Sequence, residues 1–240
     1  MSREIKILHL YHDLMNLYGD WANVAALERE LVARGCEVFA DKESVGDDID
    51  FSAYDFIYIG SGTERSVLAC MKDLMQHKDA LIRQVDVGTS VLATGNSHEL
   101  FGKSVTDPDA NEHEMLGLLD FETVQQNTRV TGDCVCTADF LEEKLIGFVN
   151  RAGGFRQGDI KRPFYLKPGE GANYSACTEG IQYKNLLGTY MTGPILVRNP
   201  PLLRYFADLL IGVSDKKNHL SDDMFLRYQE QAYSNALNKM

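Results

Sequence analysis

The stretch Ser90-Val-Leu-Ala-Thr94-Gly-Asn-Ser-His-Glu99-Leu-Phe101 decides the fold class of this chain. Ser90 to Thr94 is a short apolar segment, typical of a buried strand, that breaks at Gly95 into polar residues. The residues from Glu99 to Phe101 then have a helix-like character. A strand, a sharp turn and a helix in this order have the shape of a nucleophile elbow. The stretch therefore predicts an α/β fold with a functional turn at the end of a strand.

A βα unit opens the chain. Ile5 to Tyr11 predicts a buried strand, and Asn23 to Arg34 carries apolar residues at helical spacing before Gly35. The unit is typical of a sheet with parallel strands.

Two further strands and a helix are predicted before the elbow. Cys36 to Ala40 begins one strand, and Asp55 to Gly60 is another that leads into the Gly-rich turn Gly60-Ser-Gly62. Val67 to Gln84 predicts one continuous helix. Its expected inward residues are Leu68, Met71, Met75 and Ile82.

The second half of the chain has a different pattern. Thr128 to Thr137, Ile146 to Asn150 and Leu186 to Tyr190 read as short β segments separated by Gly, Asp and Asn. Thr106 to Glu114 is acidic and predicts an exposed loop, and Phe155 to Ala176 is Gly-rich and weakly patterned. We expect a mainly parallel sheet with a more antiparallel C-terminal portion.

The chain ends in a predicted helical tail. The charged break Ser214 to Asn218 precedes Asp222 to Leu237, whose apolar residues have helical spacing. We therefore expect one domain over residues 1–213 and a helical tail over residues 214–240.

Composition limits the functions that this chain can have. Its 240 residues are 44% hydrophobic, enough for a substantial core, and its formal net charge of -11 disfavours nucleic acid as a partner. No apolar run is long enough to span a bilayer, and Met1 to Lys6 runs into a strand-like segment rather than a signal peptide. We expect a cytoplasmic protein without a membrane span.

The five cysteines do not form a disulfide framework. Cys134 and Cys136 alternate with Val135, so both thiols would face one side of a strand, towards a metal, an oxidant or the core. Two ligands do not make a zinc site, and buried small side chains are the favoured interpretation. We expect neither a metal nor a cofactor.

Several segments resemble GatD-like proteins, within the cobyric-acid-synthase-like (CobB/CobQ-like) class I glutamine amidotransferases. The resemblance extends to about residue 212 and rests on Leu10-Tyr-His-Asp-Leu-Met-Asn-Leu-Tyr-Gly-Asp20, Tyr54-Asp-Phe-Ile-Tyr-Ile-Gly-Ser-Gly62, Met115-Leu-Gly-Leu-Leu-Asp120, Gly147-Phe-Val-Asn150 and Thr178-Glu-Gly-Ile-Gln-Tyr-Lys-Asn-Leu-Leu-Gly-Thr-Tyr190. It implies a flavodoxin-like class I glutamine amidotransferase domain, with a mainly parallel sheet and helices on both faces.

In the family that this chain resembles, a Cys thiolate on the elbow attacks the glutamine amide and a His relays the proton. The family elbow typically reads Ala-x-Cys-Gly-Gly-Tyr-Gln-Leu-Leu-Gly, and here Leu92-Ala-Thr-Gly-Asn-Ser-His-Glu-Leu-Phe-Gly102 places Gly95 at the Cys position. The family's Gly-Thr-Tyr-Leu-His-Gly-Pro appears as Gly188-Thr-Tyr-Met-Thr-Gly-Pro194, with Thr192 at the His position. We therefore expect no glutaminase activity by the usual mechanism.

The remaining candidate residues form an expected vestigial pocket: Gly60, Ser61, Gly62, Asn96, Ser97, His98 and Arg129. Gly60 to Gly62 resembles the oxyanion-side turn, although a structural turn is its favoured present role. Ser97 and His98 are a possible new nucleophile and base near Thr192, against the default of a surface pair. Cys70 and Cys177 cannot simply replace the missing thiol.

Each of two further charged residues, Arg129 and Asp20, has two possible roles. Arg129 lies where the resemblance implies an Arg that engages substrate, and a surface ion pair is the alternative. Asp20 either once supported the catalytic His or caps the following helix, and the cap is favoured.

The resemblance implies a heteromeric complex in which a GatD-like subunit feeds ammonia to MurT, a Mur-ligase-like subunit that amidates the D-glutamate of lipid II. Our first hypothesis is a non-catalytic subunit that binds such a ligase or a small ligand such as glutamine. The alternative is an active subunit that supplies ammonia for lipid II or cobyric acid amidation through displaced residues.

Overall fold

The structure is a computed structural model that describes residues 2–166, 177–212 and 223–239. Its first half contains β1 (Glu4–Leu10), α1 (Trp21–Ala33), β2 (Glu37–Glu43), η1 (Phe51–Ala53), β3 (Phe56–Ile59), α2 (Glu64–Leu74), η2 (Met75–His77), α3 (Lys78–Val87), β4 (Ser90–Thr94), η3 (Gly95–Phe101), β5 (Ser104–Thr106) and β6 (Glu112–Glu114). The second half contains β7 (Phe121–Ala138), β8 (Leu141–Gly158), β9 (Phe164–Tyr165), β10 (Thr178–Glu179), β11 (Ile181–Tyr183), β12 (Leu186–Thr189), α4 (Ile195–Arg198), α5 (Pro200–Ile211) and α6 (Met224–Leu237).

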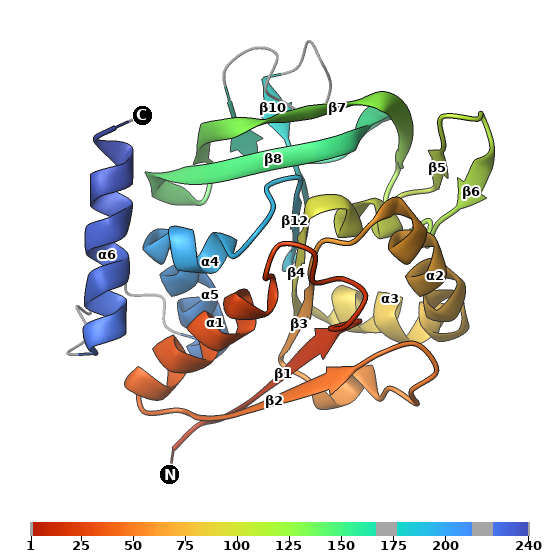
Figure 1. The fold of residues 1–240 in the computed structure, drawn as a ribbon. Helices are drawn as coiled ribbons and strands as arrows, with labels where there is room; N and C mark the ends of the chain where they lie inside the picture. Colours follow the sequence, from red (N-terminus) through yellow and green to blue (C-terminus); the bar gives the residue numbers. More distant parts are fainter. Residues whose placement is uncertain (1, 167–176, 213–222, 240) are drawn as a thin grey trace.

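The central sheet has the strand order β11-β12-β4-β3-β1-β2. Its neighbours are parallel except for the pair β11 and β12. Helices α1, α4 and α5 lie against one face and α2 and α3 against the other (Figure 1). Every residue of β3 and β4 is buried, as expected for strands covered on both faces. The predicted α/β fold, with its mainly parallel sheet, is confirmed.

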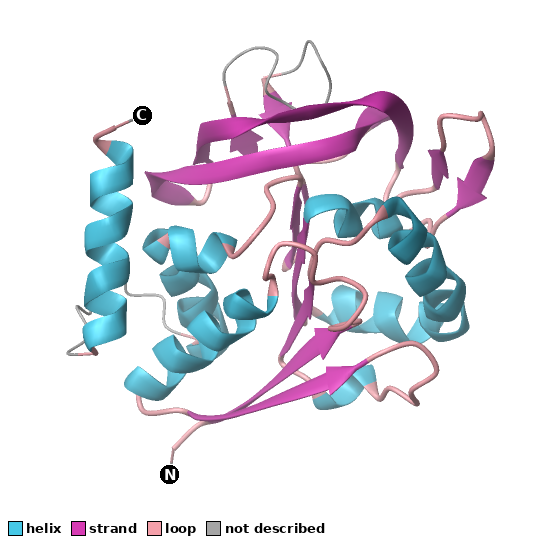
Figure 2. Cartoon of the chain, in the orientation of Figure 1, coloured by secondary structure: helices cyan, strands magenta, loops and turns pink. Residues whose placement is uncertain are grey.

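The antiparallel portion is a second sheet rather than an extension of the first. Its order is β10-β9-β7-β5-β6, with β8 also paired to β7 (Figure 2). The short strands expected at Thr128 to Thr137 and Ile146 to Asn150 belong to β7 and β8, each of 18 residues, so the expected lengths were wrong. Register shifts interrupt their pairing at three places. Because such shifts break the alternation of inward and outward residues, the pattern hid the true length.

The continuous helix expected from Val67 to Gln84 is also wrong. It is two helices, α2 and α3, separated by the 3-10 turn η2. The turn changes the helical phase, so Leu81 and Val85 are the buried residues of α3, and Met75 is exposed. Neither Gly nor Pro marks the break, which explains why the sequence pattern missed it.

The remaining predictions mostly hold. The segment 107–111 is an exposed loop, but β5 and β6 form a short hairpin at its ends. The Gly-rich segment Phe155 to Ala176 includes the end of β8 and all of β9, and its residues 167–176 lie outside the described ranges.

The predicted C-terminal helix is α6. It begins at the cap residue Asp223, which also contacts Arg29, and Tyr233 donates to the carbonyl oxygen of Lys144 on β8. The expected boundary at residue 213, like the break from Ser214 to Asn218, lies outside the described residues, so the division into domain and tail stays a prediction.

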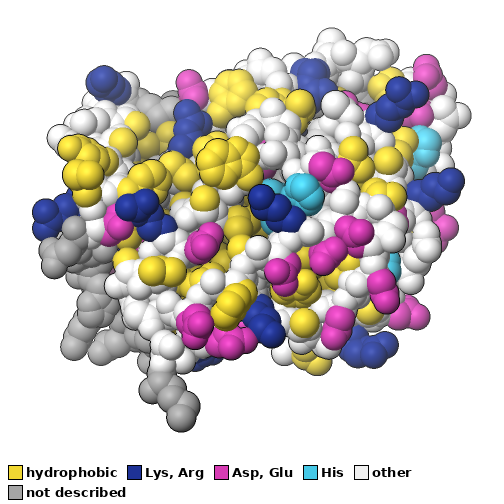
Figure 3. Space-filling model, turned by 60° about the horizontal axis from the view of Figure 1, so that its bottom comes forward, with side chains coloured by type: hydrophobic (Ala, Val, Ile, Leu, Met, Phe, Trp, Pro, Cys, Tyr) yellow, Lys and Arg dark blue, Asp and Glu magenta, His cyan; other side chains and the backbone are white. Residues whose placement is uncertain are grey.

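None of the helices in the described ranges is both long and apolar enough to cross a bilayer. On the face drawn in Figure 3, basic side chains are scattered singly among acidic ones and form no continuous patch. That distribution agrees with the acidic composition, because nucleic-acid binding needs clustered cations.

Candidate functional site

The candidate site lies where the carboxyl ends of β1, β3, β4 and β12 meet. Parallel strands bring their following loops to one edge of the sheet, which is where α/β proteins place their sites. The loop after β3 carries Gly60 to Gly62, and the turn after β4 begins at Gly95. The amide of Gly95 donates to the carbonyl oxygen of Met191 at 3.2 Å, so Thr192 follows a residue that contacts the elbow. The fold thus brings close together the two positions at which the resemblance led us to expect the catalytic Cys and His.

Gly95 has the geometry of an elbow residue. Its φ is +63°, a left-handed conformation that glycine adopts without a steric penalty, and η3 begins directly at this residue. A Cβ atom built on Gly95 would lie only 2.2 Å from Oγ of Ser61 and 2.7 Å from its Cβ. The side chain of Ser61 therefore fills the place where a residue 95 side chain would begin.

Thr192 has a structural hydrogen bond of its own. Its Oγ1 donates to the carbonyl oxygen of Phe148 at 3.2 Å, and its amide donates to the same oxygen at 2.8 Å. Thr192 also lines a shallow pocket of about 290 Å³. The other lining residues are Tyr18, Phe148, Gly193, Pro194 and Arg198.

The Gly-rich turn is tightly packed. A Cβ on Gly60 would lie 2.2 Å from the carbonyl oxygen of Met15, and one on Gly62 would lie 2.4 Å from Sδ of Met15. Asn96 pairs twice with Gly62, its Nδ2 donating to the carbonyl oxygen at 2.8 Å and its Oδ1 accepting from the amide at 3.1 Å. This packing is consistent with the structural role expected for the turn.

Ser97 and His98 are not the surface pair expected by default, because both are fully buried. Oγ of Ser97 donates to the carbonyl oxygens of Ile59 and Thr94, and Nδ1 of His98 contacts the carbonyl oxygen of Gly95 at 2.6 Å. Burial lowers the pKa of His98 to about 4. The two side chains bond main-chain atoms rather than each other, so the geometry gives no support to a new Ser-His nucleophile.

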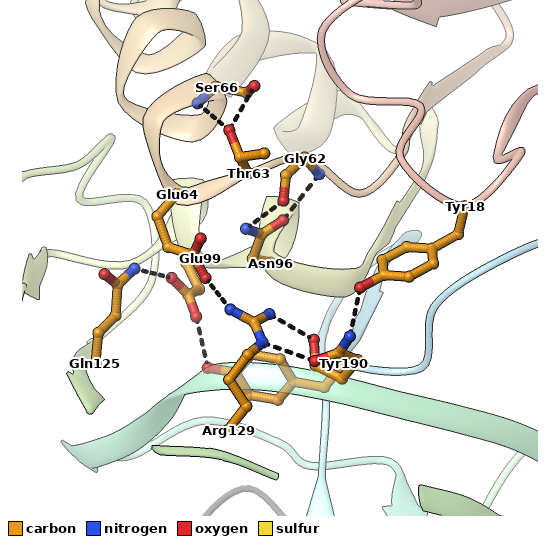
Figure 4. Close-up of polar contacts among 11 residues, drawn as sticks. Tyr18, Gly62, Thr63, Glu64, Ser66, Asn96, Glu99, Gln125, Arg129 and Tyr190 are labelled. Carbon is orange, nitrogen blue, oxygen red and sulfur yellow. Dashed lines mark hydrogen bonds and ion pairs between the residues drawn. The ribbon is translucent and has the colours of Figure 1, made fainter. Parts of the chain in front are cut away.

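Arg129 joins the turn to the second sheet (Figure 4). Its Nη1 contacts Oε1 of Glu64 at 2.5 Å, and its Nε and Nη2 donate to the side chain and main chain of Asn150 at 2.7 and 3.0 Å. Nδ2 of Asn150 in turn donates to the hydroxyl of Tyr18 at 2.8 Å. The partly exposed ion pair with Glu64 is the alternative that the sequence left open.

We expect this ion pair to contribute little to stability. A double-mutant cycle with Arg129→Ala and Glu64→Ala, followed by urea unfolding, should give a coupling of about 0.2–1 kcal/mol, as exposed pairs do. A coupling above about 2 kcal/mol would instead indicate that the pair is strongly desolvated.

Asp20 lies at the N-cap position of α1, as expected, but its side chain makes no capping hydrogen bond, so the favoured capping role was wrong. The carboxylate is fully buried and accepts from the amide of Tyr18 at 3.0 Å and from Oγ of Ser61 at 3.3 Å. It also accepts weakly from Tyr58 and Thr94. Burial raises the pKa of Asp20, and these hydrogen bonds act in the opposite direction. Asp20 therefore helps to hold the elbow in place by accepting hydrogen bonds from Ser61 and Thr94.

A second buried polar cluster lies beside η3, and the sequence interpretation missed it. Oε1 of Glu99 accepts from the hydroxyl of Tyr190 at 2.9 Å, and Oε2 accepts from Gln125 at 3.4 Å. Glu179 accepts from Thr189 and from the amide of Tyr190. Burial raises the pKa of both carboxyls to about 7, while the nearby Arg151 acts in the opposite direction.

The predicted burial of Cys134 and Cys136 is confirmed, and burial raises the pKa of the Cys136 thiol. Cys70 is buried on α2, and Cys177 is exposed. Neither belongs to the elbow, as expected.

A family model described as the CobB/CobQ-like glutamine amidotransferase domain matches residues 6–200. The chain belongs to this family. Its curated relatives include the subunit GatD of lipid II isoglutaminyl synthase (glutamine-hydrolyzing) from Staphylococcus aureus, 34% identical over 85% of this chain and 84% of the relative. The corresponding subunit from Streptococcus pneumoniae is 32% identical over 95% of this chain and 86% of the relative.

Solved structures agree on the family fold. A glutamine amidotransferase crystal structure superposes with a TM-score of 0.53 at 14% identity, covering 86% of this chain and 99% of the other. A glutamine amidotransferase from Thermotoga maritima gives a TM-score of 0.52 at 11% identity, covering 96% and 92% of the two chains. At this identity the likeness concerns the fold alone.

The family motif also marks one residue, Glu99, that the sequence interpretation passed over. In the elbow pattern the residues after the Cys are Gly, Gly, Tyr and Gln, whereas this chain has Asn96, Ser97, His98 and Glu99. A Glu at a Gln position was the available signal for the buried cluster around Glu99. Glu179 lies within the resembling segment Thr178 to Tyr190 and Arg151 directly follows Gly147 to Asn150, but neither segment indicated that these side chains would lie near Glu99.

Proposed function

We propose that this chain is a non-catalytic GatD-like subunit of a glutamine amidotransferase complex. The observation that carries the proposal is the glycine at position 95, whose side-chain space is filled by Ser61. Glycine offers no nucleophile, and the covalent step of this chemistry needs a thiolate.

The surroundings of the elbow support the same conclusion. A Thr hydroxyl cannot act as a near-neutral general base, and Oγ1 of Thr192 is engaged with the carbonyl oxygen of Phe148. Ser97 donates to main-chain carbonyl oxygens, away from His98. Within the described residues, Ser97 and His98 therefore do not form the hydrogen-bonded nucleophile and base that an active glutaminase with displaced residues would need.

The proposal places the chain in cell-wall synthesis. Both curated relatives are named as subunits of lipid II isoglutaminyl synthase, which favours lipid II over cobyric acid amidation. The expected partner is a Mur-ligase-like subunit of the MurT kind, with residues 1–213 as the amidotransferase-like domain and residues 214–240 as an appended tail. A cytoplasmic location is part of this proposal.

Ammonia and glutamate release from L-glutamine tests the proposal. The purified chain, alone and with a co-encoded Mur-ligase-like protein, should release both at the rate of the protein-free control. The Staphylococcus aureus relative, named as part of a glutamine-hydrolyzing enzyme, serves as the positive control. Release above background would overturn the non-catalytic role, and Ser97→Ala and Thr192→Ala variants would then locate the responsible group.

The partner is tested separately. The chain and a co-encoded ligase should elute together in size-exclusion chromatography at micromolar concentrations. Separate elution would contradict the proposed complex while leaving the non-catalytic role intact.

A further inference from the structure

The side chain of Asn96 behaves like a ligand bound to the Gly-rich turn. Its carboxamide oxygen accepts from the amide of Gly62 at 3.1 Å, and its NH₂ group donates to the carbonyl oxygen of the same residue at 2.8 Å (Figure 4). The pairing satisfies both main-chain groups of Gly62 at once. It joins the residue after the elbow glycine to the turn that resembles the oxyanion side.

The group that makes this pairing is the functional group of glutamine. A primary carboxamide has one acceptor oxygen and one NH₂ donor, whether it belongs to asparagine or to glutamine. A substrate carboxamide needs main-chain amides that point towards its oxygen. The amide of Gly62 already has an acceptor, so an incoming carboxamide would have to displace Asn96.

Ser61 occupies the space beside Gly95, the residue that precedes Asn96. Its Oγ lies 2.2 Å from the position of a Cβ on Gly95 and is hydrogen-bonded to Asp20 and, at 3.4 Å, to the carbonyl oxygen of Thr94. Because both partners are buried, the hydroxyl is held in place rather than free to turn away.

The turn is also held from its outer side. Glu64, two residues after Gly62, is the ion-pair partner of Arg129 on β7. Thr63 caps α2 by accepting from the amide of Ser66 at 3.1 Å. These contacts oppose a movement of the turn away from Asn96.

We propose that the chain's own side chains fill the elbow pocket, which is the space between Gly95 and the turn Gly60 to Gly62. Asn96 acts there as an internal carboxamide ligand of Gly62, and Ser61 fills the space beside Gly95. The closed pocket would exclude free L-glutamine even though the fold is retained. This inference deepens the proposed function and rests on it. A non-catalytic subunit with an open pocket would bind glutamine without hydrolysing it, whereas the closed pocket would not bind glutamine.

Calorimetric titration with L-glutamine tests the closure. The Ser61→Gly, Asn96→Gly double variant, in an otherwise unchanged chain, should bind L-glutamine at least about tenfold more tightly than the wild type. Equal affinity of the two proteins would overturn the inference, and so would a folded double variant that still does not bind.

Two control variants separate the pairing from general loosening. Asn96→Asp, combined with Ser61→Gly, keeps an acceptor for the amide of Gly62, so it should raise glutamine affinity less than the double variant does. Ser66→Ala removes the hydroxyl that contacts Thr63 beside the same turn without touching the pairing, so it should leave glutamine affinity at the wild-type level. If Ser66→Ala raised glutamine affinity as much as the double variant does, the specific role of Asn96 would be contradicted.

The fold of each variant is checked by near-ultraviolet circular dichroism. If the double variant does not fold, Asn96→Ser is the substitute, because the shorter side chain cannot make both bonds, and the same gain in affinity is expected. Ammonia release distinguishes the two proposals: release by the wild type overturns the non-catalytic role, whereas wild-type glutamine binding without release overturns only the closure.

Discussion

A Gly95→Cys variant is expected to be less stable than the wild type by about 2–5 kcal/mol. Two costs combine in that figure. A side chain at φ +63° adopts a left-handed conformation that L-residues avoid, and its Cβ would overlap Oγ of Ser61 at 2.2 Å. Urea unfolding of both proteins, followed by fluorescence, measures the difference.

Adding Ser61→Gly should restore part of that loss. The substitution removes Oγ and Cβ of Ser61, and the nearest remaining atom would be Cα of residue 61 at 3.4 Å, an ordinary contact. The strain at φ +63° stays, so recovery of about 1–3 kcal/mol is expected. A matched control, Ser66→Cys, places a thiol outside the elbow. Strictly additive effects of Gly95→Cys and Ser61→Gly would show that the two positions do not collide.

This result bears on any attempt to restore activity. A variant with only Gly95→Cys and Thr192→His would introduce the family's nucleophile into space that Ser61 occupies, and Asn96 would still bind the amide of Gly62. A lack of glutaminase activity in that double variant would therefore not show that the rest of the pocket is remodelled. A variant that also carries Ser61→Gly and Asn96→Gly is the informative one.

A Glu99→Gln variant is expected to be more stable than the wild type at pH 8, by up to about 3 kcal/mol. Burial raises the pKa of Glu99 to about 7, so the folded protein prefers the neutral carboxyl. The stability that this group contributes is complete below its unfolded pKa near 4.5 and is lost as the pH rises through about 7. Gln is neutral at every pH and has nearly the same shape.

Thermal and urea unfolding from pH 4.5 to pH 8 measures the effect. The difference between variant and wild type should be close to zero at pH 4.5, grow to pH 7 and stay constant above it. The exposed Glu37, replaced by Gln, serves as the matched control and should give a flat difference. Destabilisation by Glu99→Gln at pH 8 would mean that the ionised carboxylate, with Tyr190 and Arg151, is the form that the fold prefers.

The sequence predicted the elements of the first sheet well because their patterns are local. Continuous apolar segments such as Ser90 to Thr94 are typical of strands buried on both faces, and glycines end the first helix and open the elbow turn. The long hairpin of β7 and β8 was predicted only in pieces, since its register shifts interrupt the two-residue period. The break between α2 and α3 had no local signal.

The candidate site divides in the same way. The sequence alone established that positions 95 and 192 hold Gly and Thr, because a motif in unbroken register needs no three-dimensional information. Only the tertiary structure decided that Ser61 fills the space at Gly95, that Asn96 pairs with Gly62 and that the carboxylate of Asp20 bonds Ser61 rather than capping α1. These contacts join residues 34 to 41 positions apart. The strand ends that bring them together are set by the packing of the whole sheet, which no local pattern encodes.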